Sequence, residues 1–225
     1  MPRVADHELR RGQITRAVRT VAAARGLPGV TVARTAAEAG FSVGLVQHYF
    51  PHKNDLLRCA YTQAMADVEA RAGQHIAAAP AHRRSIREVV AESLLELLPL
   101  DDERWGEQRV MRAFGGLAAD DPQLARTAAD TGRRIRTRLA VAIANGVECG
   151  EVDPDLDPER AALRLQSLIV GLASTMFDVG NSGPASVGGP AAGATGELSS
   201  MAVSAVWDAV GEVFPGRCHQ YADRE

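Results

Sequence analysis

The chain has few cysteines, and their arrangement excludes two kinds of small domain. Its 225 residues include three cysteines, Cys59, Cys149 and Cys218, which are far apart in the sequence and form no CxxC pattern. An odd number of widely spaced cysteines is typical neither of a disulfide framework nor of a zinc-ligand set. We therefore expect reduced thiols in a cytoplasmic protein, with no metal and no cofactor.

Long apolar runs are also scarce. The N-terminus, MPRVADHELRRGQ, has no apolar core of the kind that a signal peptide requires. The most apolar segment covers residues 165–177 between Arg164 and Asp178, and it contains Gln166 and Ser167. A helix that crosses a membrane needs about 20 apolar residues. We therefore expect a soluble protein without a membrane partner.

Catalytic and metal-binding motifs are missing as well. No GxSxG, HExxH or phosphate-binding glycine loop occurs. The stretch EVDPDLDPER (residues 151–160) has three alternating aspartates, as a calcium loop does, but Pro158 stands where glycine is needed and Arg164 where a bidentate glutamate is needed. His75 and His82 lie seven residues apart without a further ligand. The sequence predicts no catalytic residues and no enzyme.

The charge is distributed unevenly along the chain, although the net charge is only −3. Residues 1–53 contain eight Lys or Arg and three acids, a net charge of +5, whereas the rest contains 17 basic and 25 acidic residues, a net charge of −8. A basic head on an acidic body favours a head that binds a polyanion. Random scatter of arginines would give the same balance, so charge alone leaves both alternatives open.

The hydrophobic pattern predicts an all-α fold. Apolar residues recur with the i, i+3, i+4, i+7 spacing of amphipathic helices at 14–21, 86–97, 165–176 and 198–213. Asp-Pro pairs at 121–122 and 157–158 supply an N-cap and a first helical residue. Residues 180–196 are rich in Gly, Pro and Ser, which predicts a flexible loop between the last two long helices.

Two short helices with a tight turn are predicted near the N-terminus. Thr31 is a suitable N-cap for a helix over 32–39, and Gly40 is suited to end that helix in a left-handed conformation. Ser42 then caps a second helix that continues to about Phe50. Two helices joined in this way are typical of a helix-turn-helix.

The second short helix has an inner and an outer face. We expect Phe41, Val46 and Phe50 to fill the core beneath it. The other residues are left on or near the outer face: Ser42, Val43, Gly44, Leu45, Gln47, His48 and Tyr49. A short exposed helix in a basic domain is suited to the major groove of DNA.

Residues 14–57 resemble the N-terminal domain of TetR-family transcriptional regulators. The matching features are the helix ITRAVRTVAAARG, the stretches VTV and AAEAGFS, the aromatic end HYF, and HKNDLL at the start of a fourth helix. The resemblance implies a helix-turn-helix DNA-binding domain over 1–53 and a helical ligand-binding and dimerisation domain over 54–225. It also implies a repressor that binds palindromic double-stranded operator DNA as a homodimer and is released by an unidentified small-molecule effector. The alternative is a ligand-sensing or protein-interaction module whose head no longer reads DNA.

Four residues are candidates for contacts with DNA phosphates. Thr31 and Ser42 offer a hydroxyl and backbone amides at helix N-termini. The resemblance assigns phosphate contacts to the Tyr49 hydroxyl and to Lys53 at the start of the fourth helix. Thr35 departs from the family pattern, which has a buried Ile at this position.

Five residues of the second short helix are candidates for base contacts. Gly44 permits close approach of the backbone, and Val43 or Leu45 could meet a thymine methyl group. Gln47 can pair with adenine through two hydrogen bonds, although the family commonly has Tyr at this position. His48 could be a contact or a plain surface residue.

The resemblance further implies an apolar pocket among helices over 54–118 and 122–179. Large, soft and aromatic side chains commonly line such pockets, although each also suits a core. The candidates are Met65, Trp105, Met111, Phe114, Met176 and Phe177. Arg109 and Arg112 could pair with an acidic ligand or neutralise Glu107 or Asp102.

The resemblance also implies a four-helix dimer interface built from helices 158–179 and 197–213. Two long apolar stripes in these segments favour such an interface, since they are longer than one small core requires. The same stripes could instead be buried within their own subunit.

Overall fold

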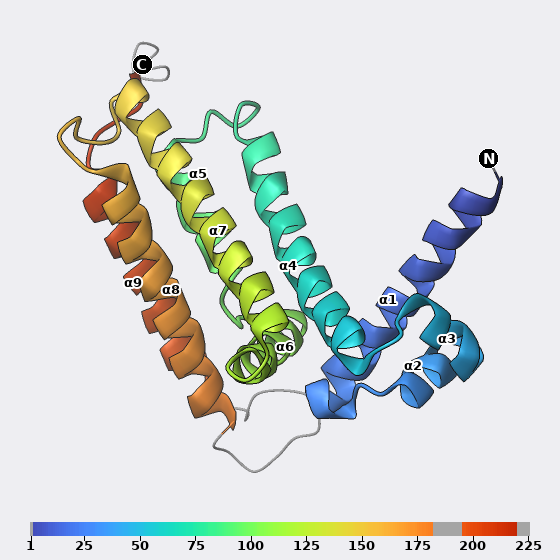
Figure 1. The fold of residues 1–225 in the computed structure, drawn as a ribbon. Helices are drawn as coiled ribbons and strands as arrows, with labels where there is room; N and C mark the ends of the chain where they lie inside the picture. The colour runs from blue at the N-terminus through green and yellow to red at the C-terminus, as the bar shows by residue number, and fades with distance from the viewer. Residues whose placement is uncertain (1, 182–194, 220–225) are drawn as a thin grey trace.

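The computed structural model describes residues 2–181 and 195–219, and these residues form helices and connecting turns with no strand. The all-α prediction is therefore confirmed. A small head at one end joins a larger helical body (Figure 1). The helices within the described ranges are α1 (Pro2–Gly29), α2 (Val32–Ala39), α3 (Val43–Tyr49), α4 (Lys53–Ala78), α5 (Ile86–Leu95), α6 (Asp102–Ala118), α7 (Pro122–Cys149), α8 (Pro158–Asn181) and α9 (Thr195–Val213).

The predicted caps of the two short helices are confirmed. The Thr31 hydroxyl accepts a hydrogen bond from the Arg34 backbone amide at 3.2 Å, and the Ser42 hydroxyl accepts one from the Leu45 amide at 3.2 Å. Gly40 ends α2 with φ at 69°, in the left-handed region where a side chain would be strained. The caps and this turn fix α3 against α2 as a helix-turn-helix.

Helix α1 is interrupted near its end. Gly26 has φ at 67° and ψ at 172°, so the last residues of α1 change direction. Beyond the break, Leu27 is buried in the head core, and the Gly29 carbonyl accepts a hydrogen bond from the Arg34 side chain at 3.2 Å. The break therefore brings the chain from the long helix into the start of α2.

The core of the head continues into the body through α4. Ile14, Val18, Val46 and Phe50 pack in one cluster with residues from the first turns of α4 and with Phe114 of α6. A boundary at residues 53 and 54 remains a prediction. Thr35 is completely buried in this region, and its hydroxyl has no hydrogen-bond partner.

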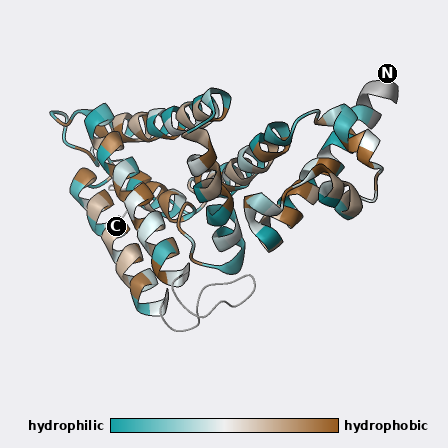
Figure 2. Cartoon of the chain, turned by 60° about the horizontal axis from the view of Figure 1, so that its bottom comes forward, coloured by the Kyte–Doolittle hydropathy of each residue, from teal (hydrophilic) through white to brown (hydrophobic). Residues whose placement is uncertain are grey.

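The body is built around a second core among α5, α7, α8 and α9. Polar and apolar positions alternate around its helices, as expected for amphipathic helices (Figure 2). Helix α7 begins at Pro122 with Asp121 as N-cap, and α8 begins at Pro158, as the two Asp-Pro pairs predicted.

The predicted loop over 180–196 needs a correction at both ends. Residues 180 and 181 belong to α8, and residues 195 and 196 belong to α9. Helix propagation is favourable once a helix is nucleated, so terminal Gly and Asn can extend one. The remainder of the predicted loop lies outside the described residues.

One described helix could cross a membrane by length and composition, over Pro158–Gly180. The apolar segment noted in the sequence covers only residues 165–177 of this helix, which are too few to cross a membrane. A single helix of this kind is weak evidence for a membrane, because core helices of soluble proteins meet the same criterion.

Candidate DNA-binding surface and ligand pocket

The candidate DNA-binding residues lie around α3 and the N-termini of its neighbours. On α3 and its cap, Ser42, Val43, Gly44, Gln47 and His48 are exposed. A Cβ atom at Gly44 would meet no atom within 4 Å, so the backbone here is open to a close partner. The outer face of α3 can therefore contact a large ligand over several residues.

The remaining candidates border this face. Leu45, Tyr49 and Thr31 are half-buried, whereas Lys53 is exposed as the first residue of α4. The His52 amide donates to the Asp55 carboxylate at 3.1 Å, which orders the start of α4 beside Lys53. A cation at an ordered helix N-terminus next to α3 is well placed for a phosphate.

Part of α1 supports α3 from the side. The His7 ring lies 4.6 Å from the Tyr49 ring, and the Arg11 guanidinium lies 5.0 Å above the Phe50 ring. The Arg10 guanidinium lies 5.4 Å above the Phe41 ring. Cation–π and aromatic contacts of this kind contribute about 0.5–1.5 kcal/mol each. No periodicity in the sequence indicated these contacts, because they join residues about 30 to 40 positions apart.

The body contains a pocket of about 350 Å³ whose walls come from α4 to α8. Three candidates from the sequence, Met65, Met111 and Phe114, line it. Tyr61 lines it too, and its ring stacks on Phe114 at 4.1 Å. Burial raises the pKa of the Tyr61 hydroxyl, which keeps this wall of the pocket uncharged. A volume of this size and a largely apolar lining suit a small organic ligand.

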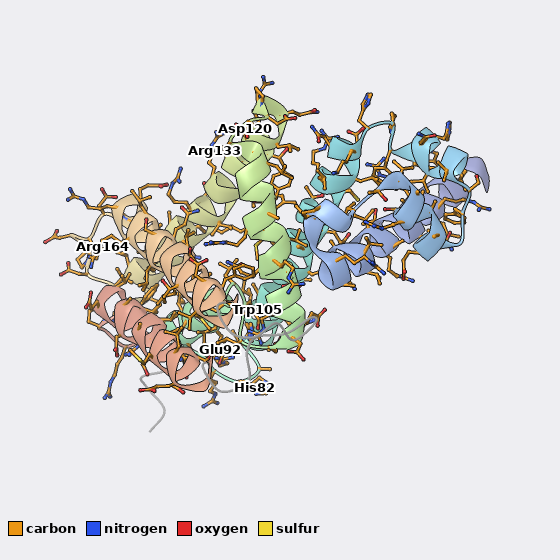
Figure 3. The ribbon with its side chains drawn as sticks, turned by 90° about the horizontal axis from the view of Figure 1, so that it is seen from below. His82, Glu92, Trp105, Asp120, Arg133 and Arg164 are labelled. Atoms are coloured by element: carbon orange, nitrogen blue, oxygen red, sulfur yellow. The ribbon has the colours of Figure 1, made fainter. Side chains whose placement is uncertain are left out.

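The other candidates do not line this pocket. Trp105 is almost fully buried, with its ring 5.0 Å from that of Phe177 and close to Gly180, where α6 meets the end of α8 (Figure 3). Met176 packs in the core of the body. The Arg109 side chain lies close to Gly26, at the contact between α6 and α1. Their residue types suit a pocket, but the helical faces they occupy point elsewhere.

The polar side chains of the pocket are neutral, with one exception. The amides of Gln108 and Gln166 and the hydroxyl of Thr131 are among its lining groups, and Arg112 is the cation. No carboxylate is among the lining residues of this pocket. Its polar character therefore favours a neutral or negatively charged ligand group.

Arg112 has partners other than those considered from the sequence. Its guanidinium donates to the Asp178 carboxylate at 2.6 Å and to the Ser174 hydroxyl, and it lies 5.4 Å above the Phe177 ring. Within the part of the chain that the structure describes, its ion pair is with Asp178 and not with Glu107 or Asp102, because the side chain points from α6 toward α8. One wall of the pocket therefore carries an oriented arginine.

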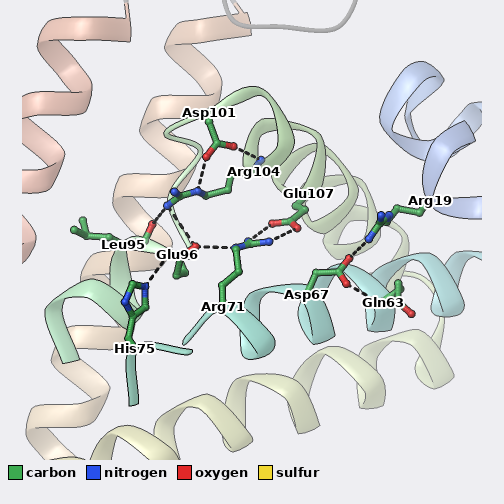
Figure 4. A network of polar contacts seen from close by, with 10 residues as sticks. All are labelled: Arg19, Gln63, Asp67, Arg71, His75, Leu95, Glu96, Asp101, Arg104 and Glu107. Carbon is green, nitrogen blue, oxygen red and sulfur yellow. Dashed lines mark hydrogen bonds and ion pairs between the residues drawn. The ribbon is translucent and has the colours of Figure 1, made fainter. Parts of the chain in front are cut away.

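A network of charged residues joins α4, α5 and α6 beside the pocket (Figure 4). Arg71 of α4 donates to Glu107 of α6 at 2.9 and 2.7 Å and to Glu96, the C-cap of α5, at 2.7 Å. The His75 ring nitrogens lie 3.0 Å from Glu96 and 2.9 Å from Glu92. These contacts connect the helix that leaves the head to two helices of the body.

Comparison with known proteins agrees with this architecture. The model for bacterial regulatory proteins of the tetR family matches residues 14–60, and the model for the C-terminal part of BetI-type transcriptional repressors matches residues 80–177. The transcriptional regulator BetI of Burkholderia cenocepacia is 31% identical over 176 residues, which cover 76% of this chain and 84% of BetI. The chain belongs to the TetR family of transcriptional regulators.

Other transcriptional regulators show similar relationships. The regulator PksA of Bacillus subtilis is 31% identical over 173 residues, which cover 77% of this chain and 81% of PksA. The crystal structure of a transcriptional regulator from Rhodococcus sp. RHA1 has a TM-score of 0.69 at 26% identity, and the match covers 90% of this chain and 95% of that one. A regulator from Saccharomonospora viridis, solved in complex with choline, has a TM-score of 0.64 at 22% identity, with 90% and 93% covered. The fold and the regulatory function of the chain are therefore those of the TetR family.

Proposed function

We propose that this TetR-family protein is a homodimeric repressor that binds a palindromic operator through α3 and is released by a small molecule in the body pocket. The observation that carries the proposal is the exposed outer face of α3, which adjoins Lys53 at the start of α4. In a dimer, two such helices about 34 Å apart would occupy successive major grooves. Gln47 and the apolar residues of α3 would read bases, while Thr31, Ser42, Tyr49 and Lys53 would contact phosphates.

The apolar exposed face of α8 and α9 supports dimerisation. Leu163 and Val170 are seven residues apart on α8 and are 51% and 63% exposed, and Met201 of α9 is 62% exposed. Residues seven apart lie on one face of a helix. Soluble monomeric proteins rarely expose an apolar face along two adjacent helices. In an oligomer, contact with a second subunit buries such a face.

A physical connection supports coupling between the pocket and the head. Helices α4 and α6 supply pocket residues such as Met65 and Phe114, and these same residues pack in the core of the head. Helix α6 also contacts α1 directly, where Arg109 lies close to Gly26. A ligand that moves α6 or α4 would therefore change how the two heads are held, with coupling of about 1–3 kcal/mol.

The lining of the pocket supports an uncharged or anionic, mainly apolar ligand. Arg112 is a cation whose charge is partly balanced by Asp178 at 2.6 Å, and no carboxylate among the lining residues would balance a cationic ligand. The regulator from Saccharomonospora viridis was crystallised with choline, which is a cation. We expect this chain to prefer a different class of effector.

The competing function is a ligand-binding module with a head that does not read DNA. An exposed Lys53 and well-capped α2 and α3 favour the repressor, because a degenerate head would not need them. The test is fluorescence anisotropy of the full chain on DNA from upstream of its own gene and on a scrambled fragment, at several salt concentrations. Tight binding of the native fragment alone supports the repressor. If both fragments bind weakly and equally, genomic fragments are selected for binding to the protein. Equally weak binding of the selected fragments would reject the repressor.

A further inference from the structure

Three potential metal ligands meet at the end of the body that is distant from the head. The thiols of Cys149 and Cys218 and the carboxylate of Glu151 lie within 4.8 Å of one another. The exposed fractions of these residues are 7%, 9% and 1%. A single buried cysteine usually serves as a small apolar residue, but here two thiols and an acid converge from segments about 70 residues apart in the sequence.

The carboxylate is already oriented by the protein. Its two oxygens accept hydrogen bonds from the backbone amides of Ile86 and Arg87 at 2.9 and 2.8 Å, at the N-terminus of α5. One of these oxygens also accepts a hydrogen bond from the Cys149 thiol at 3.3 Å. Backbone donors that fix a carboxylate are typical of the outer shell of metal sites, since they orient the ligand before the metal arrives.

The C-terminal segment that carries Cys218 is held against the turn after α7. The Gly216 amide donates to the Glu151 carbonyl at 2.9 Å, and a Cβ atom at Gly216 would lie 2.1 Å from the Gly150 carbonyl oxygen. The His219 ring lies against Gly150, which has φ at 85°. The position of Cys218 is therefore set by close backbone contact.

We propose that Cys149, Glu151 and Cys218 form a binding site for Zn²⁺. Two thiolates and one carboxylate are a ligand set that zinc accepts in tetrahedral geometry. Ligand atoms around such an ion lie about 3.3–3.8 Å apart, given metal–ligand bonds of ~2.0–2.3 Å, so the observed separations require only small side-chain shifts. The fourth position can be filled by water.

A metal at this site would connect three parts of the body. Cys149 is the last residue of α7, the Glu151 carboxylate accepts from backbone amides at the start of α5, and Cys218 follows α9. Because binding would add cross-links only in the folded state, Zn²⁺ would raise the stability of the body by mass action. The head lies at the opposite end of the molecule, so the direct effect would be on stability and on the position of α9 (Figure 1).

The test uses the full chain, reduced and treated with a chelator. Zn²⁺ is titrated in competition with a chromophoric chelator, and Co²⁺ is added separately to look for thiolate-to-cobalt charge-transfer absorption. The expected result is one Zn²⁺ per chain, a thiolate–cobalt band and a higher Tm with Zn²⁺. Cys218→Ser should weaken Zn²⁺ binding by at least about 100-fold and reduce the cobalt band.

Cys59→Ser is the matched control, because Cys59 lies in α4 next to Thr15 of α1 and belongs to a different region. It should bind Zn²⁺ as the unmodified chain does, and circular dichroism should show equal helix content in both variants. Equal Zn²⁺ affinity in Cys218→Ser and the unmodified chain would overturn the proposal. The proposal would also be overturned if the reduced protein bound no Zn²⁺ and formed a disulfide between Cys149 and Cys218 on exposure to air.

Discussion

The Arg71 guanidinium of α4 forms two nearly parallel hydrogen bonds with the Glu107 carboxylate of α6, at 2.9 and 2.7 Å. Burial raises the pKa of Glu107, and its pairing with Arg71 offsets this only in part. A paired arginine in this position keeps α4 and α6 in a fixed orientation. Since α4 begins beside the DNA-binding face and α6 lines the pocket, this pair links the helix that leaves the head to a helix of the pocket wall.

Replacing Arg71 with Leu should lower the free energy of unfolding by about 2–4 kcal/mol, because Glu107 would lose its main partner and Glu96 one of its partners. Urea denaturation followed by circular dichroism measures the change. The control is Arg133→Met in α7, whose pair with Asp130 has side chains 69% and 64% exposed. Exposed pairs contribute at most about 1 kcal/mol. Equal losses in the two variants would show that the network around Arg71 adds no stability of its own.

The free energy of unfolding should depend on pH because the carboxylates of this network titrate. The pKa of Glu92 is lowered, mainly by Arg84, and that of Glu96 is lowered because hydrogen bonds from His75 and Arg71 outweigh the effect of burial. A carboxylate whose pKa is lowered in the folded state stabilises the protein. Its full contribution is present above the pKa of the unfolded state, about 4.3 for Glu, and is lost as the pH falls through the pKa of the folded state. Glu107 acts in the opposite direction, because its pKa is raised.

The measurement is the free energy of unfolding at a series of pH values from neutral to acid, for the unmodified chain and for Glu96→Gln. The variant should lose less stability per pH unit below about pH 4.3. A variant with the same acid slope would mean that the pKa of Glu96 does not differ between the folded and unfolded states.

Two head variants should separate phosphate contacts from base contacts. Lys53→Ala should weaken binding to all DNA sequences alike and reduce the slope of log K against log salt by about one unit. Gln47→Ala should relax preference at one or two operator positions, with a loss of about 1–3 kcal/mol there. Anisotropy titrations on a set of single-base operator variants measure both. If both changes weakened all sequences equally, the assignment of Gln47 to base contact would be wrong.

Arg112 should select negatively charged effectors. A fatty acid and the alcohol of the same length serve as probes, and release of the protein from operator DNA is the readout. Arg112→Met should raise the concentration of the acid needed for release by roughly tenfold or more, because a charge-assisted hydrogen bond is lost. The response to the alcohol should change much less. Arg133→Met is the control, and an unchanged response to the acid in Arg112→Met would count against this assignment.

A charge on the exposed face of α8 should prevent dimerisation. Val170→Glu would place a carboxylate in the proposed interface, where it would be buried without a partner. Sedimentation equilibrium should then show monomers at concentrations where the unmodified chain is dimeric. Ile76→Glu is the matched control, since Ile76 of α4 is 60% exposed, close to the 63% of Val170. Monomers in both variants would place the interface elsewhere or show that either charge disturbs the fold.

Local signals in the sequence were enough to predict most of the head. Thr31, Gly40 and Ser42 act on backbone groups within three residues of themselves, so their residue types determine where α2 and α3 begin and end. Asp121 before Pro122 is a signal of the same kind. The family resemblance then supplied the roles of these elements.

The pocket and the cysteine cluster depend on contacts between distant segments, which local patterns do not encode. Trp105 and Met111 are both large residues of α6, but they lie on different faces of the helix. Trp105 is buried against Phe177, whereas Met111 faces the pocket. Cys149 and Cys218 looked unrelated by spacing, and only the return of the chain after α9 brings them together. Predicting such contacts requires the packing of whole helices.

The passage of one core through α4 has a consequence for protein engineering. Leu56, Leu57 and Ala60 lie beyond the first residue of α4, yet they fill the space beneath α1 and α3. A hybrid regulator made by exchanging heads at residue 53 would combine half of one core with half of another. The junction is better placed after Met65, so that the transplanted segment carries the α4 part of this core with it.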